Sequence, residues 1–172
     1  KACSAILVRD PSALAAAFSH DEAYMPHDQA VPNPVDLTLE YSRPLRAIKL
    51  WLAFRVHGAA EFRAALERNL EQARACHDRA AASDEFQVMP LRPALSVVPV
   101  RHVLVDCPDV DAHNRALTDA LQKDGRVFVS PATIDGRQWL RPCFTNVRTR
   151  MSDVDAFLEV AAELGHRLCP EH

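Results

Sequence analysis

The sequence is poor in glycine, has no long hydrophobic run and carries no excess of positive charge. Its four glycines stand singly and far apart, so no glycine-rich loop can wrap a phosphate group. No apolar stretch reaches the roughly 18 residues that cross a bilayer, and the first residues lack the layout of a secretory signal peptide. The net charge of −3 and the isoelectric point near 6.2 favour neither nucleic acid nor an anionic membrane surface as a partner.

Cysteine is present, but in a pattern that indicates neither a disulfide framework nor a metal site. The number of cysteines is odd, and no two of them have the C-x-x-C spacing of zinc and redox sites. We therefore expect reduced thiols, a cytoplasmic protein and no bound metal ion. The five cysteines are Cys3, Cys76, Cys107, Cys143 and Cys169.

Lysine is also scarce, and this limits the chemistry that the chain can carry. Only Lys1, Lys49 and Lys123 are present among 172 residues. An aldehyde cofactor is attached covalently through a lysine amine, so these three side chains are the only candidates for such an attachment within this sequence. The chain is nevertheless 48% hydrophobic and 25% charged, which is enough for one ordinary domain with its own core.

The first forty residues predict a strand, a helix and a long loop. Residues 3–8 form a short apolar run with β-branched members, which is typical of a buried strand. Asp10 and Pro11 then supply an N-cap and a first helical residue. Residues 20–39 are polar and interrupted by prolines, so we expect a loop of the length that often carries function.

Residues 42–58 have the pattern of a helix that carries both apolar and positively charged side chains. Ser42 is a good N-cap, Pro44 suits the first turn, and Gly58 supplies an end. Because the stretch is apolar around most of its girth, it predicts a buried helix. Lys49 falls inside the apolar belt, where an ammonium group needs a partner. An internal salt bridge, a snorkelling stem and a ligand-binding role are all open for it.

The remaining residues alternate between helical and strand patterns. Their order predicts an α+β domain, an antiparallel sheet with helices on one face. The expected elements are a helix over 58–82, strands over 86–89 and 95–100, a helix over 110–123 that ends at Gly125, a strand over 127–129, a turn at 134–137, a strand over 138–144, and a helix that begins in a capping box of Ser152 and Asp155 and ends at Gly165.

Arg141 is the strongest candidate for a binding residue. It lies in the middle of an expected strand between Leu140 and Pro142, in a run that is otherwise apolar or small. A guanidinium group in such a position suits bidentate binding of a carboxylate. That carboxylate can belong to a substrate, or it can belong to a protein side chain in a buried ion pair that braces the domain.

Two motifs resemble one enzyme family. The segment SRPLRAIKLWLAFRVHG at 42–58 is similar to the S-R-x-x-x-A-L-K-x-W segment of the pyridoxal-phosphate-dependent group II amino-acid decarboxylases, which include the aromatic-amino-acid, histidine and glutamate decarboxylases. The segment GRQWLRPCFTNVRT at 136–149 resembles the G-x-x-x-L-R-x-C-x-x-N-x-R-T strand of the same family. Both occur in the family's order and spacing.

The resemblance implies the C-terminal portion of a fold-type-I, aspartate-aminotransferase-like enzyme. Residues 1–50 then correspond to the tail of the large cofactor-binding domain, with an active-site loop at about 20–39 and the start of the connecting helix, and residues 51–172 to the small C-terminal domain. The strand at 3–8 matches the one after the Schiff-base lysine, whose motif would lie just before Lys1. Lys1 itself lies downstream of the motif position, so the cofactor lysine is expected in an N-terminal portion.

The resemblance also implies a homodimer whose loop reaches the partner subunit's active site and, in several members, carries a catalytic tyrosine. Tyr24 and Tyr41 are the only tyrosines, and neither aligns cleanly with that position. Within the loop, Tyr24 and His27 are the candidate catalytic residues. The alternative is that they are ordinary polar side chains of a solvent-exposed loop. Arg43 is expected near the cofactor or the dimer interface, or in a structural role.

The implied activity is decarboxylation of an L-amino acid, aromatic or related, to its amine and CO₂, with pyridoxal 5'-phosphate as the electron sink. Arg141 matches an arginine that binds the substrate carboxylate in glutamate decarboxylases. Two alternatives stay open: another reaction of the same fold, such as an aminotransferase or lyase, and a non-catalytic α+β module for binding or dimerisation. The sequence does not name the amino acid.

Overall fold

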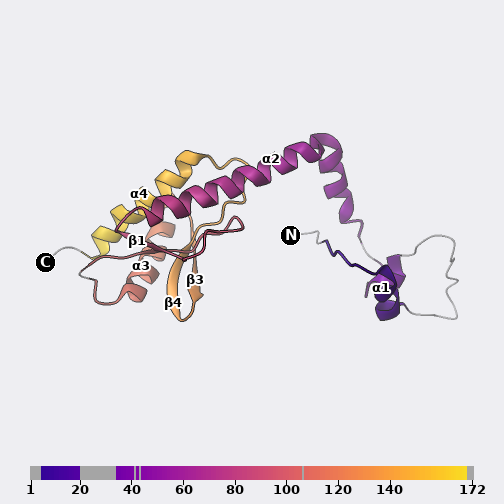
Figure 1. The fold of residues 1–172 in the computed structure, drawn as a ribbon, viewed down its shortest axis with the longest axis horizontal. Coiled ribbons are helices and arrows are strands. Elements are labelled where there is room, and N and C mark those ends of the chain that lie inside the picture. Colours follow the sequence, from indigo (N-terminus) through magenta and orange to yellow (C-terminus); the bar gives the residue numbers. More distant parts are fainter. Residues whose placement is uncertain (1–4, 20–33, 41, 43, 106, 170–172) are drawn as a thin grey trace. The chain divides into compact units, whose positions relative to one another are not determined.

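The computed structural model describes residues 5–19, 34–40, 42, 44–105 and 107–169, and it divides the chain into two compact units, Lys1–Gly58 and Ala59–His172 (Figure 1). The assignment of 1–50 and 51–172 to a large and a small domain stays a prediction. None of the helices in the described ranges combines the length and the apolar composition needed to cross a bilayer.

The first unit contains the helix α1 (Pro11–Phe18), the 3₁₀ helix η1 (Pro34–Leu37) and the beginning of α2 (Ala47–Ala81). The predicted start of α1 is confirmed: the Asp10 carboxylate accepts a hydrogen bond from the Ser12 amide at 2.9 Å, and Pro11 is the first helical residue. This carboxylate satisfies one of the amides that a helix leaves without an internal partner.

The predicted strand at 3–8 is wrong for residues 5–8, and Cys3 lies outside the described residues. Residues 5–8 adopt no regular structure, and Ile6 and Leu7 are 79% and 98% exposed. A strand requires a hydrogen-bonded neighbour, and none of the first unit's residues 5–19, 34–40, 42 and 44–58 forms a strand. The apolar run therefore has the composition of a strand without a sheet to join.

The helix expected over 42–58 begins later than predicted and is not buried. The Arg46 amide donates to the Pro44 carbonyl at 2.7 Å in a tight turn, and α2 begins only at Ala47. Trp51 and Val56 are 58% and 74% exposed, and Lys49 is exposed as well. An internal salt bridge for Lys49 is therefore not required. Within the described part of the first unit, no other element covers the apolar side chains of this helix.

The end of this helical segment at Gly58 is confirmed. Gly58 has φ 76° and ψ 158°, values outside the helical region, so α2 consists of two helical segments joined at this residue. A residue with a Cβ rarely adopts a positive φ, which is the physical reason for glycine at this position. The chain resumes its helix at Ala59 and continues to Ala81.

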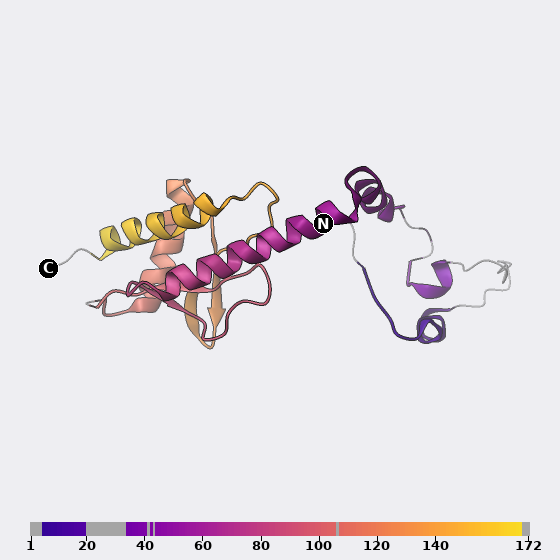
Figure 2. The ribbon, with the colours of Figure 1, turned by 45° about the horizontal axis from the view of Figure 1, so that its top comes forward.

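The second unit is the α+β domain that the sequence predicts. Its four antiparallel strands lie in the order β1-β2-β4-β3 and comprise β1 (Phe86–Val88), β2 (Val100–His102), β4 (Arg137–Arg141) and β3 (Ser130–Ile134). Three helical segments accompany the sheet, namely α2 after Gly58, α3 (Val110–Asp124) and α4 (Met151–Leu168) (Figures 1 and 2).

The core of this unit forms where the helices meet one face of the sheet. Val100 of β2 and Leu140 of β4 are directly paired and fully buried, and Leu117 and Leu121 of α3 are buried in the same apolar cluster. The second segment of α2 lies beside α4 (Figures 1 and 2), and the Arg79 guanidinium of α2 pairs with a carboxylate of α4. Burial of these apolar side chains is the main stabilising contribution to the unit.

Local signals locate α3 and the hairpin accurately. Asp109 caps α3 by accepting from the amides of Asp111 and Ala112, and Gly125 ends it with φ 82°. The β3–β4 turn has φ 50° at Asp135 and 76° at Gly136, the two positive values of a type I′ turn. The predicted start and end of α3 and the predicted turn at 134–137 are therefore confirmed.

Strand boundaries are less well predicted. The strand expected at 127–129 lies instead at Ser130–Ile134, where it pairs with β4, and the strand expected at 95–100 is Val100–His102. Val97 makes only an isolated bridge to Cys143. Pairing with neighbouring strands sets these limits, and the apolar content of a segment does not reveal them.

Both predicted ends of α4 are wrong. The helix begins at Met151, where the Arg150 amide donates to the Asp153 carboxylate at 2.9 Å; Asp155 pairs instead with Arg79. The helix also continues through Gly165 to Leu168. Gly165 is buried against the ring of His102, and a Cβ at this position would clash with His102 Cε1. Close approach to β2 explains this glycine, which does not end the helix.

Replacing Gly165 by alanine is expected to lower the free energy of unfolding by about 2 kcal/mol. The ring of His102 is enclosed, so the added methyl group overpacks the interface, and this outweighs the roughly 1 kcal/mol that alanine gains in helix propensity. Urea denaturation measures the difference. In a His102→Ala background the same substitution should no longer destabilise. If Gly165→Ala in the parent chain leaves the free energy of unfolding unchanged or raises it, the interface can relax around the methyl group.

Candidate functional site

The face of the sheet opposite the apolar core carries a row of large polar and aromatic side chains. Side chains alternate along a strand, so Arg137, Trp139 and Arg141 of β4 share this face, while Leu140 points to the core. Trp139 is only 5% exposed, although it lies outside the main apolar cluster. Arg101 of β2 joins this row, and its guanidinium carbon lies 5.5 Å from the centre of the Trp139 ring.

Arg101 is held in place by a buried ion pair. Its Nη2 donates to Asp111 Oδ1 at 2.6 Å and its Nη1 to Gln87 Oε1 at 3.3 Å, and Arg101 is 6% exposed. The same Asp111 oxygen accepts the backbone amide of Gln138 at 2.8 Å. One carboxylate in the first turn of α3 thus joins β2 and β4, and this arrangement identifies Arg101 as a structural residue.

Arg141 differs from Arg101 because its guanidinium group has no carboxylate partner in the part of the chain that the structure describes. Arg141 is half-buried, and its Nη1 contacts Cys143 Sγ at 3.5 Å. The buried ion pair that sequence analysis left open for Arg141 is therefore not formed by any described carboxylate. A half-buried guanidinium group without a carboxylate partner can bind an anionic group from outside the unit. Its role as a substrate-binding residue stays a prediction.

The other candidate residues are either exposed or outside the described ranges. Lys49 is exposed on α2 of the first unit. Arg43 and the loop candidates Tyr24 and His27 lie outside the described residues, as do Tyr41 and Lys1. Sequence analysis missed Arg101 and its partner Asp111. The signal that singled out Arg141, a cation within an apolar strand, was also present at Arg101 between Val100 and His102.

The described residues do not by themselves form a site for pyridoxal phosphate. The two lysines among them, Lys49 and Lys123, are both exposed on helices, so neither offers the sheltered amine that a Schiff base requires. Gly58, Gly125 and Gly136 lie at separate breaks and turns, and Gly165 is buried against His102. No group of them forms the amide-lined loop that binds a phosphate.

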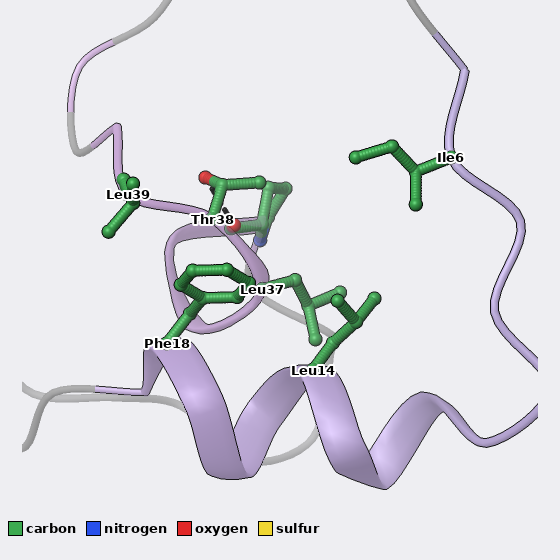
Figure 3. A pocket seen from close by; sticks show the side chains of 7 residues that line it. Ile6, Leu14, Phe18, Leu37, Thr38 and Leu39 are labelled. Carbon is green, nitrogen blue, oxygen red and sulfur yellow. Dashed lines mark hydrogen bonds between the residues drawn. The ribbon is translucent and has the colours of Figure 1, made fainter.

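The first unit contains an apolar pocket of about 550 Å³ (Figure 3). Leu14 and Phe18 project from α1 towards Leu37 of η1, as the close-up shows. Thr38 also lines the pocket, and its hydroxyl donates a hydrogen bond to the Pro34 carbonyl at 3.3 Å. Apart from the Thr38 hydroxyl, the described residues that line this pocket are apolar. It can bury apolar groups but supplies no catalytic chemistry of its own.

Comparison with known proteins adds a family and several relatives. The model of the pyridoxal-dependent decarboxylase conserved domain matches residues 1–102. The aromatic-L-amino-acid decarboxylase of Drosophila melanogaster is 26% identical over 163 residues, covering 93% of this chain and 31% of that protein. The 3,4-dihydroxyphenylacetaldehyde synthase of the same species is 28% identical, with 94% and 32% covered. The chain thus spans about a third of the length of these curated relatives.

Solved structures show the same fold. The crystal structure of Oryza sativa TDC with PLP and tryptamine matches with a TM-score of 0.81 and 22% identity, covering 94% of this chain and 35% of that one. The mouse CSAD structure matches with a TM-score of 0.73 and 17% identity, covering 92% of this chain and 35% of that one. Identities this low bear on the fold alone.

Proposed function

The chain belongs to the pyridoxal-dependent decarboxylase family, and from this we propose that it works as the C-terminal portion of an enzyme that converts an aromatic or related L-amino acid into its amine and CO₂. The observation that carries the proposal is the family match over residues 1–102, which includes the motif at 42–58. Relatives named as aromatic-L-amino-acid, tyrosine and tryptophan decarboxylases support the substrate class.

In this proposal the chain contributes binding groups, and an N-terminal portion of the enzyme contributes the cofactor site. Pyridoxal phosphate, when bound there, supplies the electron sink for loss of CO₂. Arg141 holds a carboxylate through its guanidinium fork, because no described carboxylate occupies it. We assign the loop at 20–39 to the active site of the partner subunit, as the family resemblance implies.

We further propose a cytoplasmic homodimer. The support lies in the first unit, where large apolar side chains are open to solvent, among them Leu7, Trp51 and Val56. Exposed apolar residues in such numbers are typical of surfaces that another chain or domain covers. Light scattering of the complete enzyme should give twice the mass of one polypeptide, and a monomer that retains activity would contradict this assignment.

The activity is tested with the complete polypeptide that contains this chain, supplied with pyridoxal phosphate. L-Tryptophan, L-tyrosine, L-3,4-dihydroxyphenylalanine, L-phenylalanine and L-glutamate are offered separately, and CO₂ and the organic product are measured. We expect the amine and CO₂ in equal amounts from at least one aromatic substrate. Failure to release CO₂ from any of them, together with the absence of a visible Schiff-base absorption band, would overturn the proposal.

A second candidate function has a specific observation in its favour. The relative with 28% identity is named 3,4-dihydroxyphenylacetaldehyde synthase, and another with 24% identity is named phenylacetaldehyde synthase. Proteins named as decarboxylases and proteins named as aldehyde synthases are thus similar to this chain at comparable identities, 24–28%. The same assay, with O₂, ammonia and H₂O₂ also measured, separates the two candidates. Consumption of O₂ with release of CO₂, ammonia, H₂O₂ and an aldehyde in place of the amine would support the second.

A further inference from the structure

Three ligand-type side chains from distant parts of the sequence meet at one end of the second unit. Glu85 immediately precedes β1, His102 is the last residue of β2, and His166 lies in the last turn of α4. The Val103 amide donates to the Glu85 carbonyl at 2.8 Å, which places Glu85 beside His102 across the strand pair. One ligand atom from each of the three residues lies within 4.8 Å of the others.

One ring nitrogen of His102 is buried without a hydrogen-bond partner among the described residues. The side chain is 0% exposed, and its Nδ1 lies 2.9 Å from Nε2 of His113, while its own Nε2 is buried without a hydrogen-bond partner among the described residues. If Nδ1 carries the proton and donates it to His113, the lone pair remains on Nε2. Buried polar atoms are almost always satisfied, so this atom indicates a missing partner.

The backbone of His102 is also held in place. Asn114 accepts from the His102 amide at 2.9 Å and donates to its carbonyl at 2.8 Å, which fixes the backbone at the end of β2. A neutral imidazole with a free ring nitrogen is the form that binds metal ions.

Glu85 and His166 complete the group on its solvent side. His166 Nε2 lies 2.9 Å from Glu85 Oε1, and the centres of the His166 and His102 rings are 5.6 Å apart. His166 is exposed and Glu85 half-buried, so both side chains can turn and an ion can enter from water. The packing of Gly165 on the ring of His102 is what brings the last turn of α4 this close.

We propose that Glu85, His102 and His166 bind a divalent transition-metal ion, with Zn²⁺ as the preferred ion. Two imidazoles and one carboxylate form a ligand set that Zn²⁺ accepts, with water in the fourth position. Zinc–ligand bonds of about 2.0–2.2 Å require the three donor atoms to draw closer than they lie here, and rotation of the Glu85 and His166 side chains, which reach solvent, would bring them together. His113 then holds the His102 ring from outside the coordination sphere.

This site serves a different purpose from the proposed decarboxylation. His102 points to the core face of the sheet, whereas Arg141 lies on the opposite face, and the ion would join the start of β1 and the end of β2 to the last turn of α4. We assign it a bracing role, in which the bound metal ion stabilises the C-terminal end of α4. Failure of the decarboxylase assay would leave this inference unaffected, since its tests measure only binding and stability.

The test uses the 172-residue chain after removal of metal ions with a chelator. Calorimetric titration with ZnCl₂ should show one ion per chain, and the melting temperature should rise when Zn²⁺ is added and fall again with the chelator. Co²⁺ should give the visible absorption of a tetrahedral site without the near-ultraviolet band of thiolate ligands. That absence separates the proposed site from binding by the neighbouring thiols of Cys107 and Cys169.

The variants Glu85→Gln and His166→Gln should each weaken Zn²⁺ binding by about tenfold or more, while the chain remains folded because both side chains reach solvent. His57→Gln, which removes an exposed histidine of the first unit, is the matched control and should bind as the parent does. Equal affinity in parent, Glu85→Gln and His166→Gln would overturn the proposal, as would the lack of any single saturable site in the parent.

Discussion

Replacing Arg141 by alanine in the complete enzyme is expected to raise KM or lower kcat until kcat/KM falls by about a hundredfold or more. Loss of one partner from a buried charge pair costs about 2–5 kcal/mol, and each 1.4 kcal/mol corresponds to about a factor of ten. Because Arg141 has no described carboxylate partner in its own unit, the free energy of unfolding should change by less than about 1 kcal/mol.

Two companion variants identify the cause of this loss. Arg137 lies on the same strand and the same face but is exposed, so Arg137→Ala should leave kcat/KM close to that of the parent. Arg141→Lys keeps the charge but not the planar fork, and it should recover only part of the loss. If Arg141→Ala instead retains its kinetics and loses stability, Arg141 has the structural role that the sequence left open.

Replacing Asp111 by alanine should lower the free energy of unfolding by about 3 kcal/mol. Removing one partner of a buried ion pair typically costs about 3–5 kcal/mol, and the lower end applies because the Asp111 side chain is partly exposed. The substitution leaves the charge of Arg101 buried without a counterion, and it also removes the acceptor for the Gln138 amide. Urea denaturation of the 172-residue chain measures the difference.

Replacing Arg101, the other partner of the ion pair, should lower the free energy of unfolding by less. This difference tests whether burial of the Arg101 charge causes the loss in Asp111→Ala. Arg101→Met fills the space of the side chain and leaves Asp111 able to reach water, so we expect a loss of about 1 kcal/mol. The double variant R101M/D111A should be more stable than Asp111→Ala alone. Asp155→Ala breaks a more exposed pair with Arg79 and should cost less than about 1 kcal/mol. Equal losses for Asp111→Ala and Asp155→Ala would show that burial of Arg101 does not matter.

The proposed metal site consists of residues that are not close in the sequence, and the expectation of no metal site stays a prediction. The expectation of no metal site came from the lack of C-x-x-C and similar local patterns, in which neighbouring residues share one ion. Glu85, His102 and His166 are far apart in the sequence and approach one another only when β1, β2 and α4 pack together. A search by spacing cannot find ligands that are brought together by strand pairing and helix packing.

The sequence by itself determined the features that depend on a few neighbouring residues. Asp10 and Asp109 cap their helices through amides two or three positions away, and Gly125, Asp135 and Gly136 adopt the positive φ values of a helix end and a tight turn. The order of helical and strand patterns was likewise sufficient for the α+β class. These interactions are local, so they form in the same way whatever surrounds them.

Only the tertiary structure decided the features that depend on contacts between segments far apart in the sequence. Residues 5–8 have the composition of a strand but no described strand beside them, and the apolar helix after Ala47 has no described covering layer in its unit. Gly165 has the appearance of a helix end, yet it is there because His102 leaves no room for a methyl group. Burial, pairing and close approach are relations between distant segments, and a linear sequence does not state which segments will meet.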